Sequence, residues 1–299
     1  MAWNIIWQVD PDDLTSCIER DWFAEITADI PVDTKVVDYA GAPRLACVLP
    51  RSIACISSPN QTSQDDLVAY LRRLPRPLVV YHMSDEFIEV GQAFHEHCDL
   101  IIRNGSAIFD ERHPRLMQIP LGYASGFRNM SEQFPDAGSR KISFSFMGSM
   151  KHERSTQMLP AMTTLPGQHY VRKTGSFAAS TQRFNATSVA IYKNTVFVPN
   201  PKGNWSPECN RLYDALEWGC IPLIRDYAES PYHRGYHDRL LGPHPIPTFF
   251  DWADAAAFAG DLMSRPAALD RLQADLSTWW RAYKARLRAD IARALSQYE

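Results

Sequence analysis

The sequence predicts an α/β fold made of two halves, in each of which strands and helices alternate. Between residues 195 and 224 an apolar run, a polar loop, a helical segment and a second apolar run follow one another. A strand–helix–strand unit of this length implies parallel strands with a right-handed crossover. The alternation stops at 133–140, a polar stretch with Pro and Gly that is typical of a linker, and then starts again. We therefore expect domains at 1–132 and 141–275, and a separate helix at 276–299.

Apolar runs rich in β-branched residues predict the strands of the N-terminal half, and apolar residues at helical spacing predict its helices. The expected strands are Asn4–Val9, Lys35–Tyr39, Ala46–Leu49 or Ile53–Ile56, Leu78–Tyr81, Leu100–Arg103 and Met117–Pro120. The expected helices are Asp12–Glu25, Thr62–Leu74 and Phe87–His97. The stripe of the second helix that we expect to be buried consists of Leu67, Tyr70, Leu71 and Leu74.

The C-terminal half repeats this pattern and ends in helices. Its expected strands are Ile142–Met147, His169–Lys173, Thr195–Pro199, Cys220–Ile224 and Pro247–Phe250. Its expected helices are Glu153–Leu165, a helix that starts at Ser206, Asp254–Met263, Ala267–Ala274 and Leu276–Ser296. Two alternating halves predict two separate parallel sheets.

The helix expected after the polar loop opens with residues typical of a helix start. We expect Ser206 to be the N-cap, Pro207 the first helical residue and Glu208 a favourable charge in the first turn. Gly219 is expected to end the helix in the left-handed conformation. Parallel sheets bind ligands beyond the carboxyl ends of their strands, and the unpaired N–H groups of a helix start favour phosphates there.

Arg211 and Asp214 lie one turn apart near the start of this helix. A cation beside a diphosphate and a carboxylate beside ribose hydroxyls would suit a nucleotide-sugar. The alternative is that the two side chains form an ordinary surface ion pair at helical spacing.

The string S-P-x-x-N-R-L-Y-D-A-L-E-W-G-C-I-P-L-I, which begins at Ser206, resembles the donor-binding signature of exostosin-like glycosyltransferases. The sequence departs from that signature at Leu223, where Val is usual, and at Asn210, where Ser or Arg is familiar. The resemblance implies the GT-B architecture, in which two Rossmann-like halves face a cleft, and a nucleotide-sugar as the donor substrate. The donor-binding residues that it implies here are Arg211, Asp214, Ser206, Glu208 and Asn210.

A smaller feature follows the first strand of the C-terminal half. Gly148 allows a ligand to approach the backbone closely, and Arg154 stands at the start of the next expected helix. A cation there would stabilise the charge that develops on a departing nucleoside diphosphate. An arginine at a solvated helix start is the ordinary alternative. We add Gly148 and Arg154 to the predicted donor site.

In the N-terminal half, His82, Asp85 and Glu86 follow the strand expected at 78–81. This places them at the ligand-facing end of the sheet, where one of them can take the proton of an acceptor hydroxyl. Alternatively, Ser84 caps the next helix and the carboxylates complement its dipole. Ser-Asp-Glu, followed by LIIRN and IPLGYASGF, is similar to the N-terminal half of exostosin-like sequences, including relatives of the ribitol-phosphate xylosyltransferase. We rank Asp85 first as the catalytic base, Glu86 second and His82 third.

The composition is that of a globular enzyme. The chain has 299 residues, 45% of them apolar and 22% charged, and its net charge of −3 gives no reason to expect a nucleic-acid partner. Six cysteines show no zinc spacing, so we expect reduced thiols, and the first residues lack the basic region of a signal peptide. No apolar run reaches the length of a membrane span. These features predict a cytoplasmic protein without a metal or a bound cofactor.

The final helix has two interpretations. Its apolar residues recur at helical spacing, with Arg and Lys between them. Such a helix can lie on an anionic membrane surface, where a lipid-linked acceptor would be found. We prefer the alternative, in which the helix packs back across the two halves.

Together these features predict a glycosyltransferase that transfers a hexose or pentose from a nucleotide-sugar to a glycan or lipid-linked glycan, with inversion and without a metal. Two alternatives stay open: an epimerase-type enzyme acting on sugar nucleotides with the same fold, and a non-catalytic glycan-binding descendant. The absence of GxGxxG and GxxxxGK[ST] disfavours a dinucleotide-binding enzyme and a P-loop protein.

Overall fold

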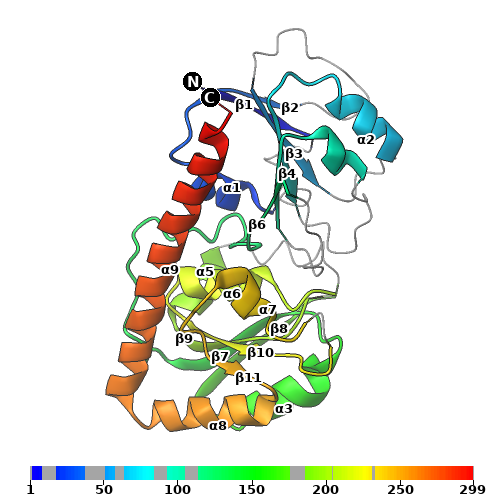
Figure 1. Ribbon diagram of the computed structural model, residues 1–299. Coiled ribbons are helices and arrows are strands. Elements are labelled where there is room, and N and C mark those ends of the chain that lie inside the picture. Colours follow the sequence, from blue (N-terminus) through cyan, green and yellow to red (C-terminus); the bar gives the residue numbers. More distant parts are fainter. Residues whose placement is uncertain are drawn as a thin grey trace. The chain divides into compact units, whose positions relative to one another are not determined.

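The structure, a computed structural model, describes residues 2–8, 18–37, 51–57, 64–83, 93–104, 114–175, 186–203, 205–230 and 233–298. The chain divides into two compact units. Unit 1 comprises 1–121 and 286–299, and unit 2 comprises 122–285 (Figure 1).

Unit 1 contains a parallel sheet whose strands have the order β2-β1-β3-β4-β5-β6. The strands are β1 (Trp3–Trp7), β2 (Val32–Val37), β3 (Ser52–Ser57), β4 (Leu78–Met83), β5 (Leu100–Arg103) and β6 (Leu116–Gln118). All of the strands expected in this half are found, within a few residues, and Ile53–Ile56 rather than Ala46–Leu49 marks β3. The latter segment lies outside the described residues.

The helices of unit 1 are shorter than expected where the structure describes them. They are α1 (Arg20–Ile26), α2 (Gln64–Leu71) and the 3-10 helix η1 (Ala93–His97). The stripe expected to be buried is confirmed, since its four residues are at most 4% exposed, although Leu74 lies just beyond the end of α2. They belong to one apolar core with strand residues such as Ile6 and Val80. The expected helical segments 12–17, 62–63 and 87–92 lie outside the described residues.

Unit 2 contains a second parallel sheet, with the order β11-β10-β9-β7-β8. Its strands are β7 (Ile142–Gly148), β8 (Gln168–Lys173), β9 (Thr195–Asn200), β10 (Ile221–Arg225) and β11 (Thr248–Phe249). Each matches an expected strand. β7, β9 and β10 are almost wholly buried, which explains why they appear in the sequence as continuous apolar runs.

The helices of unit 2 differ more from expectation. They are the π-helical turn η3 (Arg154–Met158), α3 (Leu159–Met162), α5 (Ala186–Lys193), α6 (Asn210–Glu217), α7 (Tyr236–Leu241), α8 (Trp252–Met263) and α9 (Pro266–Ser296), besides the 3-10 turn η2 (Ala137–Ser139). The sequence analysis did not identify α5 and α7. It expected one regular helix in place of η3 and α3. Pro160 has no N–H with which to continue the α-helical hydrogen-bond pattern there.

The expected start of α6 was wrong. The helix begins at Asn210, and its N-cap is Cys209, in extended conformation with φ −157°. Ser206 instead accepts a hydrogen bond on Oγ from the backbone N–H of Glu208, at 3.1 Å. This local turn within the loop satisfies the serine side chain before the helix starts. The expected end is confirmed, because Gly219 follows the last turn with φ +62°.

The division expected between Ala267–Ala274 and Leu276–Ser296 was also wrong, since α9 is one helix of 31 residues. No Pro or Gly interrupts 267–296. The helix belongs to unit 2 up to Ala285 and to unit 1 from Arg286 (Figure 1). Most of its apolar stripe is buried in the protein, namely Trp280, Tyr283, Leu287, Ile291 and Leu295. Little of that stripe is left to contact a membrane.

The segment 133–140, expected to be a linker, is hydrogen-bonded within unit 2. The backbone N–H of Ala137 donates to Gln273 Oε1 at 2.8 Å. Arg140 donates to the carbonyl oxygens of Thr195 and Trp218, and the second of these bonds is 2.9 Å long. Hydrogen bonds from this stretch therefore connect it to β9, to the end of α6 and to α9.

Within the described part of the chain, no helix is long and apolar enough to cross a membrane. Among the cysteines that the structure describes, Cys55, Cys98, Cys209 and Cys220, no disulfide joins one to another.

Candidate functional site

The strand order of unit 2 defines where a ligand is expected to bind. β7 is the first strand of the sheet in the chain, β8 lies on one side of it, and β9 returns to the other side. In open parallel sheets, the crevice beyond the carboxyl ends of two such strands is the usual ligand site. Here it is bounded by Gly148 at the end of β7, by Ser149 after it, and by Asn200 and the loop that leads to α6.

Arg211 lies at this edge of the sheet. Its side chain is 3% exposed. Nε donates to the carbonyl oxygen of Met147 at 3.3 Å, and the guanidinium carbon lies 4.5 Å from the ring centre of Phe146. Among the described residues, Nη1 has no hydrogen-bond partner. A buried N–H of this kind is costly unless a ligand satisfies it.

Gly148 leaves the space that this guanidinium occupies. A Cβ atom at this position would lie 2.8 Å from Nη2 of Arg211 and 3.1 Å from Cζ of Phe146. Gly148 was predicted to belong to the donor site because a glycine lets a ligand approach the backbone closely. In the structure, the space beside Gly148 is occupied by the guanidinium group of Arg211.

We expect Gly148→Ala to shift the guanidinium and reduce anion affinity about tenfold, a loss of roughly 1.4 kcal/mol. Stability should change little, because the displaced group is the flexible end of a side chain. Calorimetric titration and thermal unfolding measure the two effects. Gly175→Ala is the matched control, since a Cβ there meets no atom of the described residues within 4 Å. A variant at Gly148 that binds as well as wild type contradicts this assignment.

Arg154 is the second buried cation of the site, at 4% exposure. Nη1 donates to Ser149 Oγ at 2.7 Å, and Nη2 donates to the carbonyl oxygens of Lys202 and Gly203, the latter at 3.2 Å. Burial, and next the positive charge of Arg211, lower the pKa of Arg154 from its usual value. The two guanidinium groups are therefore close enough to repel each other.

The neighbouring carboxylate only partly offsets these charges. Glu153 accepts a hydrogen bond from the hydroxyl of Tyr227 at 2.6 Å. The same hydroxyl accepts from the backbone N–H of Lys202 at 2.7 Å. Burial, followed by the charge of Glu153, raises the pKa of Tyr227. The network holds the loop after β9 in place.

Asn200 is a site residue that the sequence analysis missed. β7 and β9 pair with Phe144 opposite Phe197, so three residues further along Asn200 lies beside Met147. Its side chain is 1% exposed, and neither its amide nitrogen nor its amide oxygen has a partner within the part of the chain that the structure describes. A polar residue that ends an otherwise apolar strand, in VFVPN, is the signal that could have identified it.

Arg211, Arg154 and Asn200 thus present buried polar atoms at the carboxyl edge of β7 and β9. Two like charges buried together are unfavourable unless an anion joins them. Guanidinium groups bind phosphate oxygens strongly and with defined geometry. The arrangement fits a diphosphate, with a neutral amide beside it that can both donate and accept hydrogen bonds.

Asp214 and Asn210 point from α6 to a different neighbour. Asp214 Oδ1 accepts from the backbone N–H of Ala124 at 2.9 Å, and Asn210 Nδ2 donates to the carbonyl oxygen of Gly122 at 3.0 Å. Both side chains therefore bind the backbone of the segment that starts at Gly122. A contact of Asp214 with ribose stays a prediction.

Glu208 and Ser206 lie in the interior next to this site, at 2% and 1% exposure. The two carboxylate oxygens of Glu208 accept hydrogen bonds from the hydroxyls of Tyr213 and Tyr236. Burial and the charge of Glu208 raise the pKa of Tyr213. These contacts fix the loop in front of α6. That Glu208 and Ser206 also contact the donor stays a prediction.

The catalytic candidates belong to unit 1. His82 lies within β4 rather than after it, because the strand continues to Met83, and its ring is fully buried 5.1 Å from the ring centre of Phe94. Asp85 and Glu86 lie outside the described residues. Their ranking as bases therefore stays a prediction.

Glu19 is a second residue that the sequence analysis missed. It precedes α1 and is 1% exposed. Phe23, one turn along the helix, contacts Trp7 at the end of β1, with ring centres 5.2 Å apart. Glu19 therefore lies beyond the carboxyl end of that strand. Burial raises its pKa to about 7. A carboxyl group with such a pKa is typical of acid–base catalysts.

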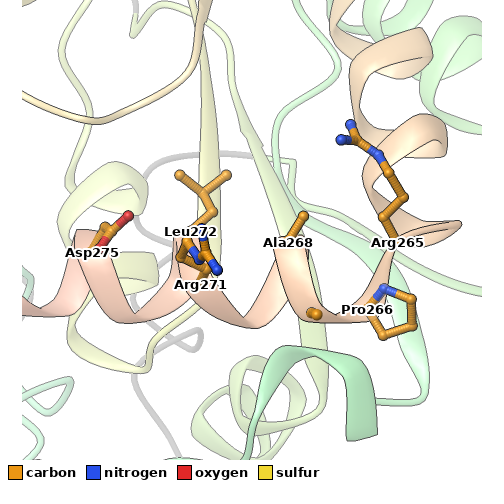
Figure 2. A pocket seen from close by; sticks show the side chains of 7 residues that line it. Arg265, Pro266, Ala268, Arg271, Leu272 and Asp275 are labelled. Atoms are coloured by element: carbon orange, nitrogen blue, oxygen red, sulfur yellow. The ribbon is translucent and has the colours of Figure 1, made fainter.

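An open depression of about 520 Å³ lies along the start of α9, lined by Arg265, Pro266, Ala267, Ala268, Arg271, Leu272 and Asp275. Figure 2 shows their side chains along the helix. Arg265 is paired with Asp261, and the polar groups are exposed. Because the depression lacks buried unsatisfied groups, the arginine pair at β7 and β9 is the stronger candidate site. The residues that the structure describes contain no cluster of His, Cys, Asp and Glu that could hold a metal ion.

Comparisons with known proteins agree with this architecture. No protein-family model matches the chain. No curated protein matches it. HepE from Anabaena, solved in complex with UDP, is 12% identical with a TM-score of 0.51 and is covered over 100% of its length.

Two further solved structures are also similar over 99% of this chain. The O-GlcNAc transferase of Thermobaculum terrenum, solved as a mutant, is 13% identical with a TM-score of 0.56, and 66% of that chain is covered. The DNA-modifying β-glucosyltransferase, studied with and without uridine diphosphoglucose, is 11% identical with a TM-score of 0.57 and is covered completely. At such identities the similarity establishes the fold. The expected α/β class is confirmed as the GT-B glycosyltransferase fold.

Proposed function

We propose that this chain is a glycosyltransferase that takes a sugar from a nucleotide-sugar donor, as exostosin-like enzymes do. The observation that carries the proposal is the pair of buried guanidinium groups, Arg211 and Arg154, at the carboxyl edge of β7 and β9. In this proposal they bind the donor diphosphate and stabilise the negative charge that develops on it as the glycosidic bond breaks. The relatives of known fold include one solved with UDP and one studied with uridine diphosphoglucose, which supports a nucleotide-sugar ligand.

Asn200 and Asp214 complete the donor side of this proposal. The amide of Asn200, beside Met147, is available for hydroxyl or phosphate oxygens. Asp214 is proposed to contact the ribose, and Ser206, Glu208 and Asn210 hold its helix and loop in place.

The rest of the proposed reaction is taken from the sequence-based predictions. A carboxylate of unit 1, ranked as Asp85 and then Glu86, removes the proton of an acceptor hydroxyl as its oxygen attacks the anomeric carbon. The sugar is transferred with inversion, and two arginines take the place that a metal ion has in other transferases. The acceptor is a glycan or a lipid-linked glycan, and the enzyme works in the cytoplasm.

Replacing Arg211 tests the donor site. Arg211→Ala is expected to weaken the binding of UDP and UDP-glucose about tenfold to hundredfold, because a hydrogen bond to a charged group contributes roughly 1.5–3 kcal/mol. Arg211→Lys should restore part of the loss, since it keeps the charge but not the planar fork. Isothermal titration calorimetry measures the affinities.

The matched control is Arg271→Ala, an exposed arginine of the depression along α9, which should bind as wild type does. If Arg211→Ala leaves the affinities unchanged, or if Arg271→Ala lowers them equally, the arginine pair is not the donor site. Retained far-ultraviolet circular dichroism separates loss of binding from loss of fold.

A further inference from the structure

Trp205 is an exposed aromatic residue in the loop between β9 and α6. Its exposure is 55%, which is high for a large apolar side chain. The sequence analysis assigned no role to it. An exposed tryptophan has an energetic cost that burial in a ligand complex would remove.

The loop that carries Trp205 is held on both sides. Before it, Arg154 binds the carbonyl oxygens of Lys202 and Gly203. After it, the carbonyl oxygen of Ser206 accepts from the backbone N–H of Gly203 at 2.8 Å. Gly203 before the tryptophan and Ser206 after it are therefore joined by a backbone hydrogen bond.

The backbone of Trp205 lies near the residues that Arg154 binds. Trp205 is two residues from Gly203, so their Cα atoms are at most about 7.6 Å apart. Gly203 itself is hydrogen-bonded to Arg154. An exposed aromatic side chain is thus attached two residues from a carbonyl group that Arg154 binds.

A ligand that matches both features has an anionic part and a flat aromatic part. A nucleoside diphosphate combines them, and stacking of a base on an aromatic side chain contributes about 1–3 kcal/mol. We propose that the nucleobase of the donor stacks on Trp205 while Arg211 and Arg154 bind its diphosphate. This inference rests on the proposed nucleotide-sugar site and adds the residue that binds the base.

The experiment compares ligands with and without a base. UDP, GDP and inorganic pyrophosphate are titrated into wild type, Trp205→Ala, Trp205→Phe and Arg211→Ala. Trp205→Ala is expected to bind the tighter of UDP and GDP about tenfold to hundredfold more weakly, with pyrophosphate affinity unchanged. Trp205→Phe should keep most of the nucleotide affinity. Arg211→Ala should lose affinity for all three ligands.

Phe250→Ala is the matched control, because Phe250 is 61% exposed and follows β11, two strands away from β9 in the sheet. It should bind all ligands as wild type does. Unchanged nucleotide affinity in Trp205→Ala, or an equal loss for pyrophosphate, overturns the stacking proposal while the anion site stands. If wild type binds neither nucleotides nor pyrophosphate, the proposed function fails, and this inference fails with it.

Discussion

Replacing Lys284 with alanine is expected to lower the free energy of unfolding by about 3 kcal/mol, which is a large effect for one side chain. Lys284 Nζ lies 2.6 Å from Glu217 Oε1, and the Glu217 side chain is 2% exposed. The substitution leaves a buried carboxylate without its cation. Glu217 keeps hydrogen bonds from two neutral groups, Trp280 Nε1 and the backbone N–H of Asn129. We therefore expect a destabilisation at the lower end of the range that is typical when a buried ion pair loses one partner.

Urea unfolding, followed by circular dichroism, measures this loss. The double variant Lys284→Ala, Glu217→Gln should recover part of it, because no buried charge remains. Arg265→Ala is the control for an exposed pair: with Asp261 more than half exposed, the cost should be below about 1 kcal/mol. Equal losses in Lys284→Ala and Arg265→Ala would show that burial does not strengthen the Glu217 pair.

Replacing Asp85 with asparagine is expected to reduce turnover by about 10²–10⁴ while donor affinity stays as in wild type, because general-base catalysis contributes a factor of this size. The amide keeps the shape of the carboxylate but cannot accept a proton. Release of the nucleoside diphosphate from a nucleotide-sugar measures turnover, and calorimetry measures donor affinity.

Glu86→Gln and Glu19→Gln belong in the same experiment. Adjacent side chains diverge on a helix and on a strand, so of Asp85 and Glu86 one should matter far more than the other. Glu19 is included because the structure shows a buried carboxyl group with a pKa of about 7. Normal turnover in Asp85→Asn refutes the ranking, and a large loss confined to Glu19→Gln assigns the base to that residue.

Much of the fold was predictable because its signals are local. Apolar runs such as Thr195–Pro199 and Leu100–Arg103 correspond to buried strands within one residue at either end. Helix boundaries were less predictable. Serine is a residue type that is favoured at the N-cap of a helix. The Oγ of Ser206, however, accepts from the N–H of Glu208 within the loop, and the helix starts at Asn210. Local propensity alone does not distinguish a capped helix from a capped turn.

The candidate site was predictable only in part. Arg211, Arg154 and Gly148 were identified, but the reason for Gly148 is the guanidinium of Arg211, 63 positions away, rather than a ligand. Asn200 was missed, because its importance comes from two unsatisfied amide atoms that only the packing around it reveals.

The sequence by itself determined the α/β class, the parallel strands and the approximate bounds of the strands. These depend on the order of apolar and polar residues along the chain, which is a local property. Only the tertiary structure decided which polar groups meet. Arg211 bonds to Met147 over 64 positions, and Asp214 bonds to Ala124 over 90. Although they lie one turn apart on α6, the two side chains have different partners, because the fold places the end of β7 beside Arg211 and the segment that starts at Gly122 beside Asp214.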